Sequence, residues 1–205
     1  MSKTPKKPEL ARLIEFHKFL LKFQAIERHI CYVDEGLTKS ENDAEHSFSM
    51  AMTAWFIASH FPKLDQAKIV QYALVHDLLE VYAGDTPVFG DKKVLASKVE
   101  REAKAVKQLA KVWADFPEMN QAIQDYENQV NEEAKFVFAL DKIMPIILNI
   151  VSEGQAWKMH GIQIEQLHDA KKDKVKAHPE VHDYYQQIYE LLQQNSHFFA
   201  QKATV

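Results

Sequence analysis

The chain has 205 residues, a formal net charge of −4, one cysteine and five glycines. This length allows one domain with a sizeable core, and the mildly negative charge argues against binding to polymeric nucleic acid or anionic membranes. No apolar run reaches the roughly 18 residues that predict a membrane span. Cys31 alone excludes an internal disulfide framework, and the start MSKTPKKPEL has no apolar signal core. We therefore expect a cytoplasmic protein.

The composition and the apolar periodicity both favour helices. Ala, Leu, Lys, Glu and Gln, all good helix formers, dominate, and no alternating strand pattern persists beyond a few residues. Helices are predicted at 10–25, from about 43, 65–83, 94–113, 117–130, 131–154 and 180–200, with a polar amphipathic segment at 161–177. The fold class is therefore all-α. No linker divides the chain, so we expect one domain over 1–205, with a core at about 10–154 and C-terminal helices 161–203 packed on it.

Two further structural expectations come from the periodicity. Residues 27–44 have no helical period, and we expect a long loop, a feature often linked to function. The helix that starts near residue 43 is expected to turn its large apolar residues inward: Phe48, Met52, Trp55, Phe56 and Ile57.

The stretch Val70–Val88, VQYALVHDLLEVYAGDTPV, combines an apolar helix with ionisable groups. Four such groups, His76, Asp77, Glu80 and Asp85, have no packing reason to be there, and burying them unpaired is costly. A divalent metal is the simplest compensation, because one cation holds imidazole and carboxylate together. Glu80 follows His76 by four residues and Asp77 by three, so it lies over the same turn.

Further ligand candidates come from two other predicted helices. His46 lies in the first turn of one, and Asp141 lies inside the apolar run FVFALDKIMPIIL of the other. Each has a plainer interpretation by itself. His46 is compatible with a hydrogen bond to backbone at a helix start, and Asp141 with a buried salt bridge to Lys142 or another cation. Together with His76-Asp77 they form a set of two imidazoles and two carboxylates.

These four residues, in this order, resemble the HD superfamily of metal-dependent phosphohydrolases. The segment Glu41–Ser47, ENDAEHS, is similar to the E-x-x-x-E-H-S pattern of one branch, and His76–Asp85 to its HD-x-x-E-x-x-x-G-D pattern. The run Glu133-Ala134-Lys135 ahead of Leu140-Asp141-Lys142 is also similar. That branch contains bacterial 5′-deoxynucleotidases and their eukaryotic HD-domain relatives. The similarity spans roughly residues 16–154.

The resemblance implies a phosphodiesterase-like helical HD domain. His46, His76, Asp77 and Asp141 would bind one divalent ion, for which Mn, Co, Mg, Zn and Fe are candidates. Glu80 and Asp85 would be the catalytic carboxylates. The substrates implied are nucleoside 5′-monophosphates, possibly deoxyribonucleotides, hydrolysed to nucleoside and phosphate, and the relatives are often homodimers.

The chemistry of phosphomonoester hydrolysis agrees with these residues. A metal activates the attacking water and polarises the phosphoryl group. Glu80 and Asp85 supply a base and an acid, and the sequence leaves open which is which. Two alternatives also stay open: hydrolysis of another small phosphate ester or a pyrophosphorylated nucleotide, and a non-catalytic, metal-stabilised domain.

Arg28 is the candidate clamp for the phosphate. Here the sequence departs from the branch, which has an Arg-Trp pair associated with rejecting ribose, whereas this chain has Arg28-His29. That difference bears on sugar selectivity and on the nucleotide assignment, but not on the metal ligands. The remaining charged features are expected to be structural: the run Lys171–Lys174 as a solvated helix face, and seven other histidines as surface or core residues (His17, His60, His160, His168, His178, His182 and His197).

Overall fold

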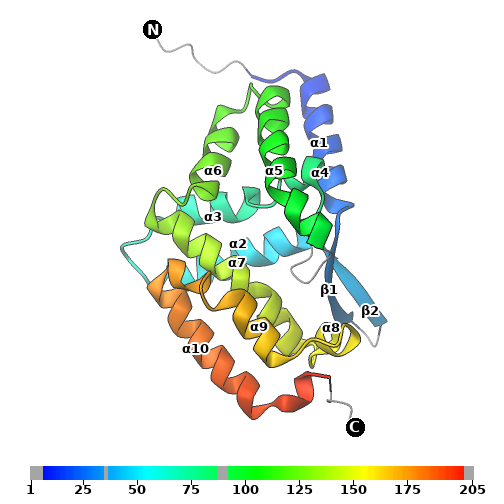
Figure 1. Ribbon diagram of the computed structural model, residues 1–205. Coiled ribbons are helices and arrows are strands. Elements are labelled where there is room, and N and C mark those ends of the chain that lie inside the picture. The colour runs from blue at the N-terminus through cyan, green and yellow to red at the C-terminus, as the bar shows by residue number, and fades with distance from the viewer. Residues whose placement is uncertain (1–6, 35–36, 87–91, 201–205) are drawn as a thin grey trace.

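The computed structural model describes residues 7–34, 37–86 and 92–200. Ten helices, two short 3₁₀ segments and one hairpin make up the described part of the chain, and Figure 1 shows their arrangement. Their bounds are α1 Leu10–Gln24, β1 Glu27–Asp34, β2 Leu37–Asn42, α2 Asp43–Ala58, α3 Gln66–Val75, α4 Glu80–Ala83, α5 Lys92–Val112, α6 Pro117–Glu127, α7 Glu132–Val151, α8 Gln155–Met159, α9 Ile164–Lys171, η1 Val175–Ala177, α10 Pro179–Gln194 and η2 Ser196–Phe198. The prediction of an all-α fold is confirmed, with the hairpin as its one β element in the described residues.

Helix α7 lies at the centre of the molecule. It contacts α2, α3, α6, α10 and the strand β1, and its apolar residues fill the larger of two buried clusters. Phe136, Leu140 and Ile143 of α7 are almost completely buried there, together with Met50 of α2 and Ile69 of α3. The metal-ligand candidates on α2 and α7 are therefore placed by the part of the core that is packed on all sides.

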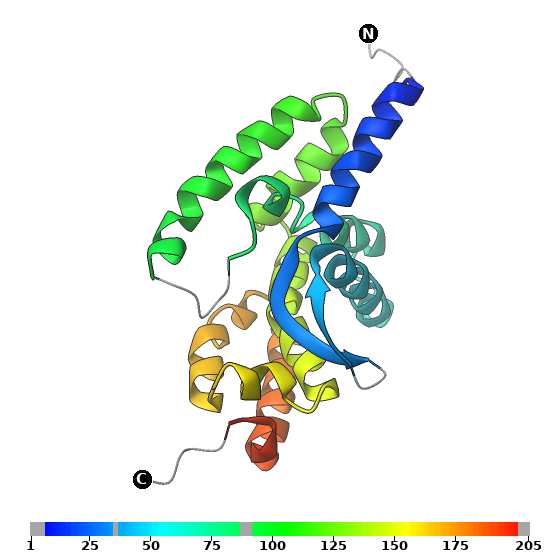
Figure 2. The ribbon, with the colours of Figure 1, turned by 90° about the vertical axis from the view of Figure 1, so that its right-hand side faces the viewer.

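A second apolar cluster holds the upper layer of Figure 1 together. Phe19 of α1 and Trp113, just after α5, pack with their ring centroids 5.4 Å apart, and Leu79 lies in the same cluster. Figure 2 shows α1, α5 and α6 standing side by side on this layer. This cluster fixes the segment that follows His76 and Asp77.

The expectation of a loop over residues 27–44 is wrong. Strands β1 and β2 form an antiparallel pair, with Cys31 opposite Ser40 and a register shift between Glu27 and Cys31. Ile30, Tyr32 and Val33 favour strands, and only two residues, Glu35 and Gly36, separate the two strands. Strand β1 contacts α7 and α8, which places Arg28 and its neighbours against the centre of the molecule.

The expected inward face of α2 is also wrong. Phe48, Met52, Trp55 and Phe56 are exposed, Phe48 by 65% and Phe56 by 69%, whereas Ile57 is buried. The buried face consists mainly of small residues such as Ala51 and Ala54. Because α2 is apolar on most sides, its periodicity did not identify the inner face; small side chains allow it to pack closely against α3 and α7.

The helix predicted over 65–83 is interrupted at the site residues. Helix α3 ends at Val75, and residues 76–79 form a turn with i→i+3 hydrogen bonds before α4 begins at Glu80. Pro87, which by its missing N–H is expected to prevent a helix from resuming after Gly84, lies outside the described residues. No helix among those described is both long and apolar enough to span a bilayer.

Candidate metal centre and cavity

The four predicted metal ligands converge in the centre of the molecule. His46 Nε2 lies 3.2 Å from Asp141 Oδ1 and 3.9 Å from Asp77 Oδ2. His76 Nε2 lies 3.1 Å from Asp77 Oδ2 and 3.8 Å from Asp141 Oδ1. Both imidazoles are buried. Spacing in the sequence therefore identified four side chains that three separate helical segments bring together.

Local structure fixes the direction of each imidazole. His76 lies at the C-cap of α3, and its Nδ1 is 2.8 Å from the carbonyl oxygen of Ala73, so its Nε2 is turned toward the carboxylates. His46 lies in the first turn of α2, which begins with a capping box between Asn42 and Glu45. Its Nδ1 lies 3.5 Å from Glu41 Oε2. Each ring thus has one nitrogen held by the protein and the other directed into the cluster.

Asp141 lies between the two histidines and a lysine. Lys142 Nζ donates a hydrogen bond to Asp141 Oδ2, so the plainer interpretation of a salt bridge to Lys142 holds beside the contacts with the histidines. Burial raises the pKa of Asp141, but Lys142 and the hydrogen bond with His46 outweigh this and hold it well below its usual value. Asp141 is therefore an ionised carboxylate, the form that binds cations.

Glu80 differs from Asp141 in its protonation state. Burial and the nearby carboxylates of Asp77, Asp43 and Asp85 outweigh Arg28 and together raise its pKa to about 10. Burial and the charge of Asp77 outweigh Arg28 and a hydrogen bond with Glu80, so the pKa of Asp43 is raised to about 6. In the protein without added cations, Glu80 is therefore a protonated carboxyl group, and Asp77 beside it is ionised.

Arg28 reaches into the same cluster from strand β1. Its Nη1 donates to Asp77 Oδ2 at 2.7 Å and to Asp43 Oδ1 at 3.4 Å, and its Nε lies 3.3 Å from Glu41 Oε2. The side chain is mostly buried but faces the cavity described below. Three carboxylates thus orient Arg28 beside the predicted ligands.

Asp85 follows α4 and Gly84, whose φ of +73° suits a residue without a side chain. Arg101 of α5 holds this segment. Its guanidinium donates to the carbonyl oxygen of Ala83 and, at 2.8 Å, to Thr86 Oγ1. Asp85 is thereby directed into the same cavity as Glu80.

A cavity of about 690 Å³ opens beside the cluster, large enough for a nucleotide. Its lining includes Arg28, Asp77, Glu80, Asp85 and Asp141, all predicted from the sequence. His46 and His76 lie behind this lining, in the core.

Several lining residues were missed or misread in the sequence. Lys171, expected on a solvated face, is buried and lines the cavity, and His160, expected to be structural, also lines it. His29 and Trp157 contribute as well. Trp157 stacks on Phe199, with 4.7 Å between ring centroids. No spacing pattern links these residues, because they come from β1, α8 and α9, which are brought together only in the fold.

The cluster fits a divalent metal. One ligand atom each from His46, His76 and Asp77 lie within 4.8 Å of one another, and Asp141 Oδ1 approaches both histidines. His76 Nε2 is buried and has no hydrogen-bond partner among the described residues, an arrangement that a metal would satisfy. Two imidazole nitrogens and two carboxylate oxygens suit several first-row ions.

Comparison with known proteins agrees with this geometry. The profile described as "HD domain" matches residues 21–182. The chain belongs to the HD-domain family. It is 28% identical to the mouse 5′-deoxynucleotidase HDDC2 over 152 residues, which are 73% of each protein, and 27% identical to the Xenopus laevis HDDC2 over 180 residues, 87% of this chain and 86% of that one.

A solved structure shows the same fold. The crystal structure of a predicted metal-dependent phosphohydrolase from Magnetospirillum magnetotacticum superposes with a TM-score of 0.74 and 27% identity. The match covers 97% of this HD-domain chain and all of the other. The fold and family predicted from the sequence are confirmed.

Proposed function

We propose that this HD-domain protein is a metal-dependent phosphohydrolase that converts nucleoside 5′-monophosphates, deoxyribonucleotides among them, to nucleoside and phosphate. The observation that supports this most is the convergence of His46, His76, Asp77 and Asp141 beside a nucleotide-sized cavity. The names of the relatives, 5′-deoxynucleotidase and metal-dependent phosphohydrolase, agree with this chemistry.

The four residues would hold one divalent ion, with Mn, Co, Mg, Zn and Fe as candidates. Bound there, the ion would supply Lewis-acid activation of the attacking water and of the phosphoryl group. The contact of His76 Nδ1 with the Ala73 carbonyl leaves its Nε2 free to act as a ligand. Ionised Asp77 and Asp141 supply the negative charge that such an ion requires.

Glu80 and Asp85 would transfer the protons. Hydrolysis forms a bond between phosphorus and a water oxygen and breaks the bond to the 5′-oxygen, so one proton leaves the water and one reaches the nucleoside. Both carboxyl groups line the cavity, and Glu80 adjoins Asp77 and Asp43. Either can serve as base with the other as acid.

Arg28 would bind the phosphate that is hydrolysed. Asp77, Asp43 and Glu41 hold its guanidinium at the edge of the predicted ligand set. A planar guanidinium presents several donors, so some remain for phosphate oxygens when others are paired with carboxylates. His29, which follows it, also lines the cavity, where the sugar or base would lie.

We also propose a single-domain, cytoplasmic homodimer. The exposed face of α2, formed by Phe48, Met52, Trp55 and Phe56, is an apolar patch of the kind that self-association buries. A Phe56→Glu variant is expected to be monomeric by light scattering. A wild-type protein that is already monomeric would contradict the dimer.

The test of the activity is phosphate release from ribo- and deoxyribonucleoside 5′-monophosphates. Protein freed of metal would receive Mn, Co, Mg, Zn or Fe(II) in turn, with Asp77→Ala for comparison. Release that needs a metal and disappears in the variant is expected. A folded, metal-loaded protein that releases no phosphate from any of these nucleotides would overturn the proposal and favour another phosphate ester or a non-catalytic domain.

A further inference from the structure

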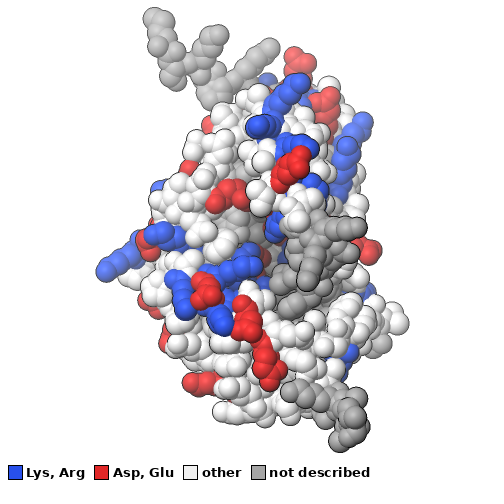
Figure 3. Space-filling view, in the orientation of Figure 1, with Lys and Arg blue, Asp and Glu red and all other residues white. Residues whose placement is uncertain are grey.

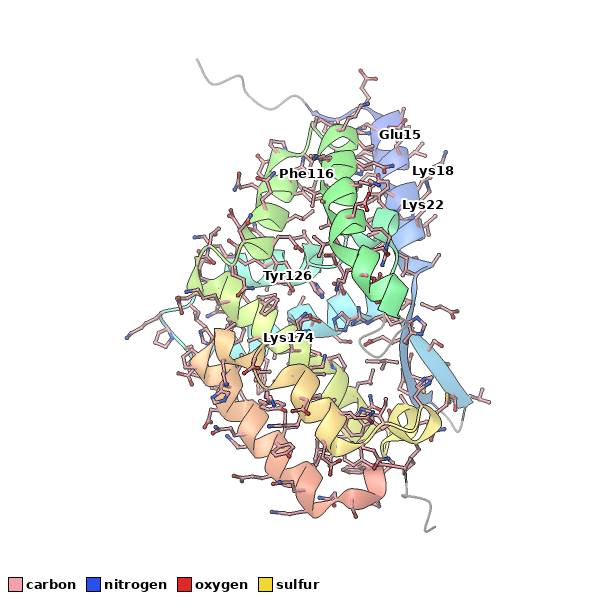
Figure 4. The ribbon with its side chains drawn as sticks, viewed as in Figure 1. Glu15, Lys18, Lys22, Phe116, Tyr126 and Lys174 are labelled. Carbon is pink, nitrogen blue, oxygen red and sulfur yellow. The ribbon has the colours of Figure 1, made fainter. Side chains whose placement is uncertain are left out.

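The cavity has a second charged region, opposite in sign to the carboxylate cluster. Lys171 ends α9, Lys174 lies in the turn that follows, and Lys98 lies on α5; all three line the cavity. Figure 3 shows lysine and arginine side chains gathered over this part of the molecule, and Figure 4 places Lys174 beside α7 and α9. The cavity is therefore acidic where Asp77 and Asp141 lie and basic where α9 meets it.

Lys171 is the most unusual of these lysines, because the residue is only 5% exposed. Among the described residues, neither its ammonium group nor that of Lys174 has a hydrogen bond or ion pair. The neighbouring lysines differ: Lys172 pairs with Asp169 at 2.5 Å and Lys176 with Asp173 at 2.8 Å. The two lysines that line the cavity are thus the two left without a carboxylate on this segment.

A buried ammonium group without an anion is unfavourable. Burial and the charges of Lys142 and Lys174 outweigh Asp141 and together lower the pKa of Lys171 to about 8. Lys174 likewise has a lowered pKa, through burial and the charges of Lys142 and Lys98. Lys171 is still largely protonated at neutral pH, so an anion placed among these lysines would relieve their mutual repulsion.

The phosphate to be hydrolysed does not fill this region. It must lie against the predicted metal ligands, where Arg28 and Lys142 are the nearby cations. If the substrate had one phosphate only, the uncharged sugar and base would face Lys171 and Lys174. Both would then stay unpaired while losing contact with water.

We propose that Lys171 and Lys174, assisted by Lys98, form a basic subsite that binds a second phosphate of the substrate, one that is not hydrolysed. This rests on the proposed phosphohydrolase activity and specifies its substrate as a nucleotide that carries a second phosphate besides the one hydrolysed. The second phosphate can be the 3′-phosphate of a nucleoside 3′,5′-bisphosphate, whose 5′-phosphate is then the one hydrolysed. It can instead be the phosphate next to the nucleoside in a nucleoside 5′-diphosphate, whose terminal phosphate would be hydrolysed to leave the nucleoside 5′-monophosphate. Both present anionic phosphate oxygens to the lysines.

Binding to the metal-free, full-length protein tests the subsite without relying on turnover. Calorimetry would give the Kd of AMP, ADP and adenosine 3′,5′-bisphosphate for the wild type and for Lys171→Gln and Lys174→Gln. The matched controls are Lys172→Gln and Lys176→Gln, on the same segment but paired outward. Each cavity variant is expected to weaken the favoured two-phosphate ligand by about tenfold or more, with AMP changed by less than about threefold. The controls should match the wild type, and the stronger of ADP and the bisphosphate reports where the second phosphate lies.

Two results would overturn the subsite. Equal losses for AMP and both two-phosphate ligands would show that the lysines serve the hydrolysed phosphate, and unchanged binding in Lys174→Gln and Lys171→Gln would show that they bind none. Because Lys171 is buried, the result for Lys171→Gln counts only if the variant melts cooperatively. Lys174 keeps much of its side chain in solvent, so Lys174→Gln tests the subsite independently. Lysine-dependent binding by a protein that hydrolyses no nucleotide would refute the activity alone and leave the subsite standing.

Discussion

The acidic and basic parts of the cavity lining are built in different ways. The acidic part comes from the turn after α3, from α4 and the residues that follow it, and from α7. Two of its carboxylates are paired with cations: Asp141 with Lys142 and Asp77 with Arg28. The basic part comes from the end of α9 and the turn beyond it, where Lys171 and Lys174 have no described carboxylate partner. Paired charges in a packed core are suited to holding a cation in fixed geometry, whereas unpaired lysines on a later segment are suited to receiving an anion from solution.

The largest effect is expected from breaking the acidic part. Asp77→Ala removes the carboxylate that approaches both His46 and His76. We expect metal content to fall and hydrolysis to drop by at least about a hundredfold, the upper range seen when only outer partners of a metal site are lost. Metal analysis and phosphate release measure both, with exposed Asp169→Ala as the control. If the Asp77→Ala variant keeps both its metal and its activity, Asp77 is not a metal ligand.

Glu80→Gln tests whether the acidic part contains a proton-transfer group in addition to ligands. The amide keeps the size of the side chain but cannot exchange a proton, so kcat should fall by about a hundredfold or more while metal content stays the same. Because Glu80 is protonated in the metal-free protein, thermal stability of that form should not fall. Loss of metal together with activity would instead make Glu80 a ligand.

The smallest effect is expected on the pH dependence of stability, through a histidine next to the segment that carries Lys171 and Lys174. His178 lies at the start of α10, just beyond η1, and is buried with its ring 5.2 Å from that of Phe136. Burial lowers its pKa, although the carboxylates of Glu132 and Glu180 oppose this. Its contribution to stability is therefore present above the unfolded pKa of about 6.5 and is lost as pH falls through the folded value.

Thermal melts at pH 7.5 and pH 5.5 measure this contribution. The wild type is expected to lose more stability on acidification than His178→Gln, which has no group to titrate. Equal losses in both proteins would show that His178 does not support this region through its neutral form.

The acidic part could be predicted from the sequence because its residues break a pattern. His76 and Asp77 end an apolar helix, and Asp141 interrupts the most apolar run of the chain, so each is visible as an ionisable group without a packing role. Burial of Arg28 was less visible, since it lies on a strand that was mistaken for a loop. That error followed from the composition of β2, LTKSEN, which has few residues that favour strands. Among the described residues, the two strands pair only with each other, so no larger sheet repeats the pattern.

The basic part could not be predicted from the sequence, because lysines that are neighbours in the sequence lie in different environments. In the run Lys171–Lys174, Lys172 is paired on the surface and Lys171 is buried, and only the packing of α9 decides between them. The prediction of which face of α2 is buried was wrong for a related reason. Phe48 and Phe56 are as apolar as any core residue, so burial depends on what lies opposite, not on the helix itself.

Crystals soaked with Mn²⁺ and measured by anomalous scattering test the central claim most directly. A single strong peak within about 2.0–2.3 Å of His46 Nε2, His76 Nε2 and one oxygen each of Asp77 and Asp141 is predicted. That result would place the metal in the acidic part of the cavity, beside Arg28 and Glu80. A peak elsewhere, or none at this cluster in crystals that bind Mn²⁺, would contradict the account of this site as a metal centre.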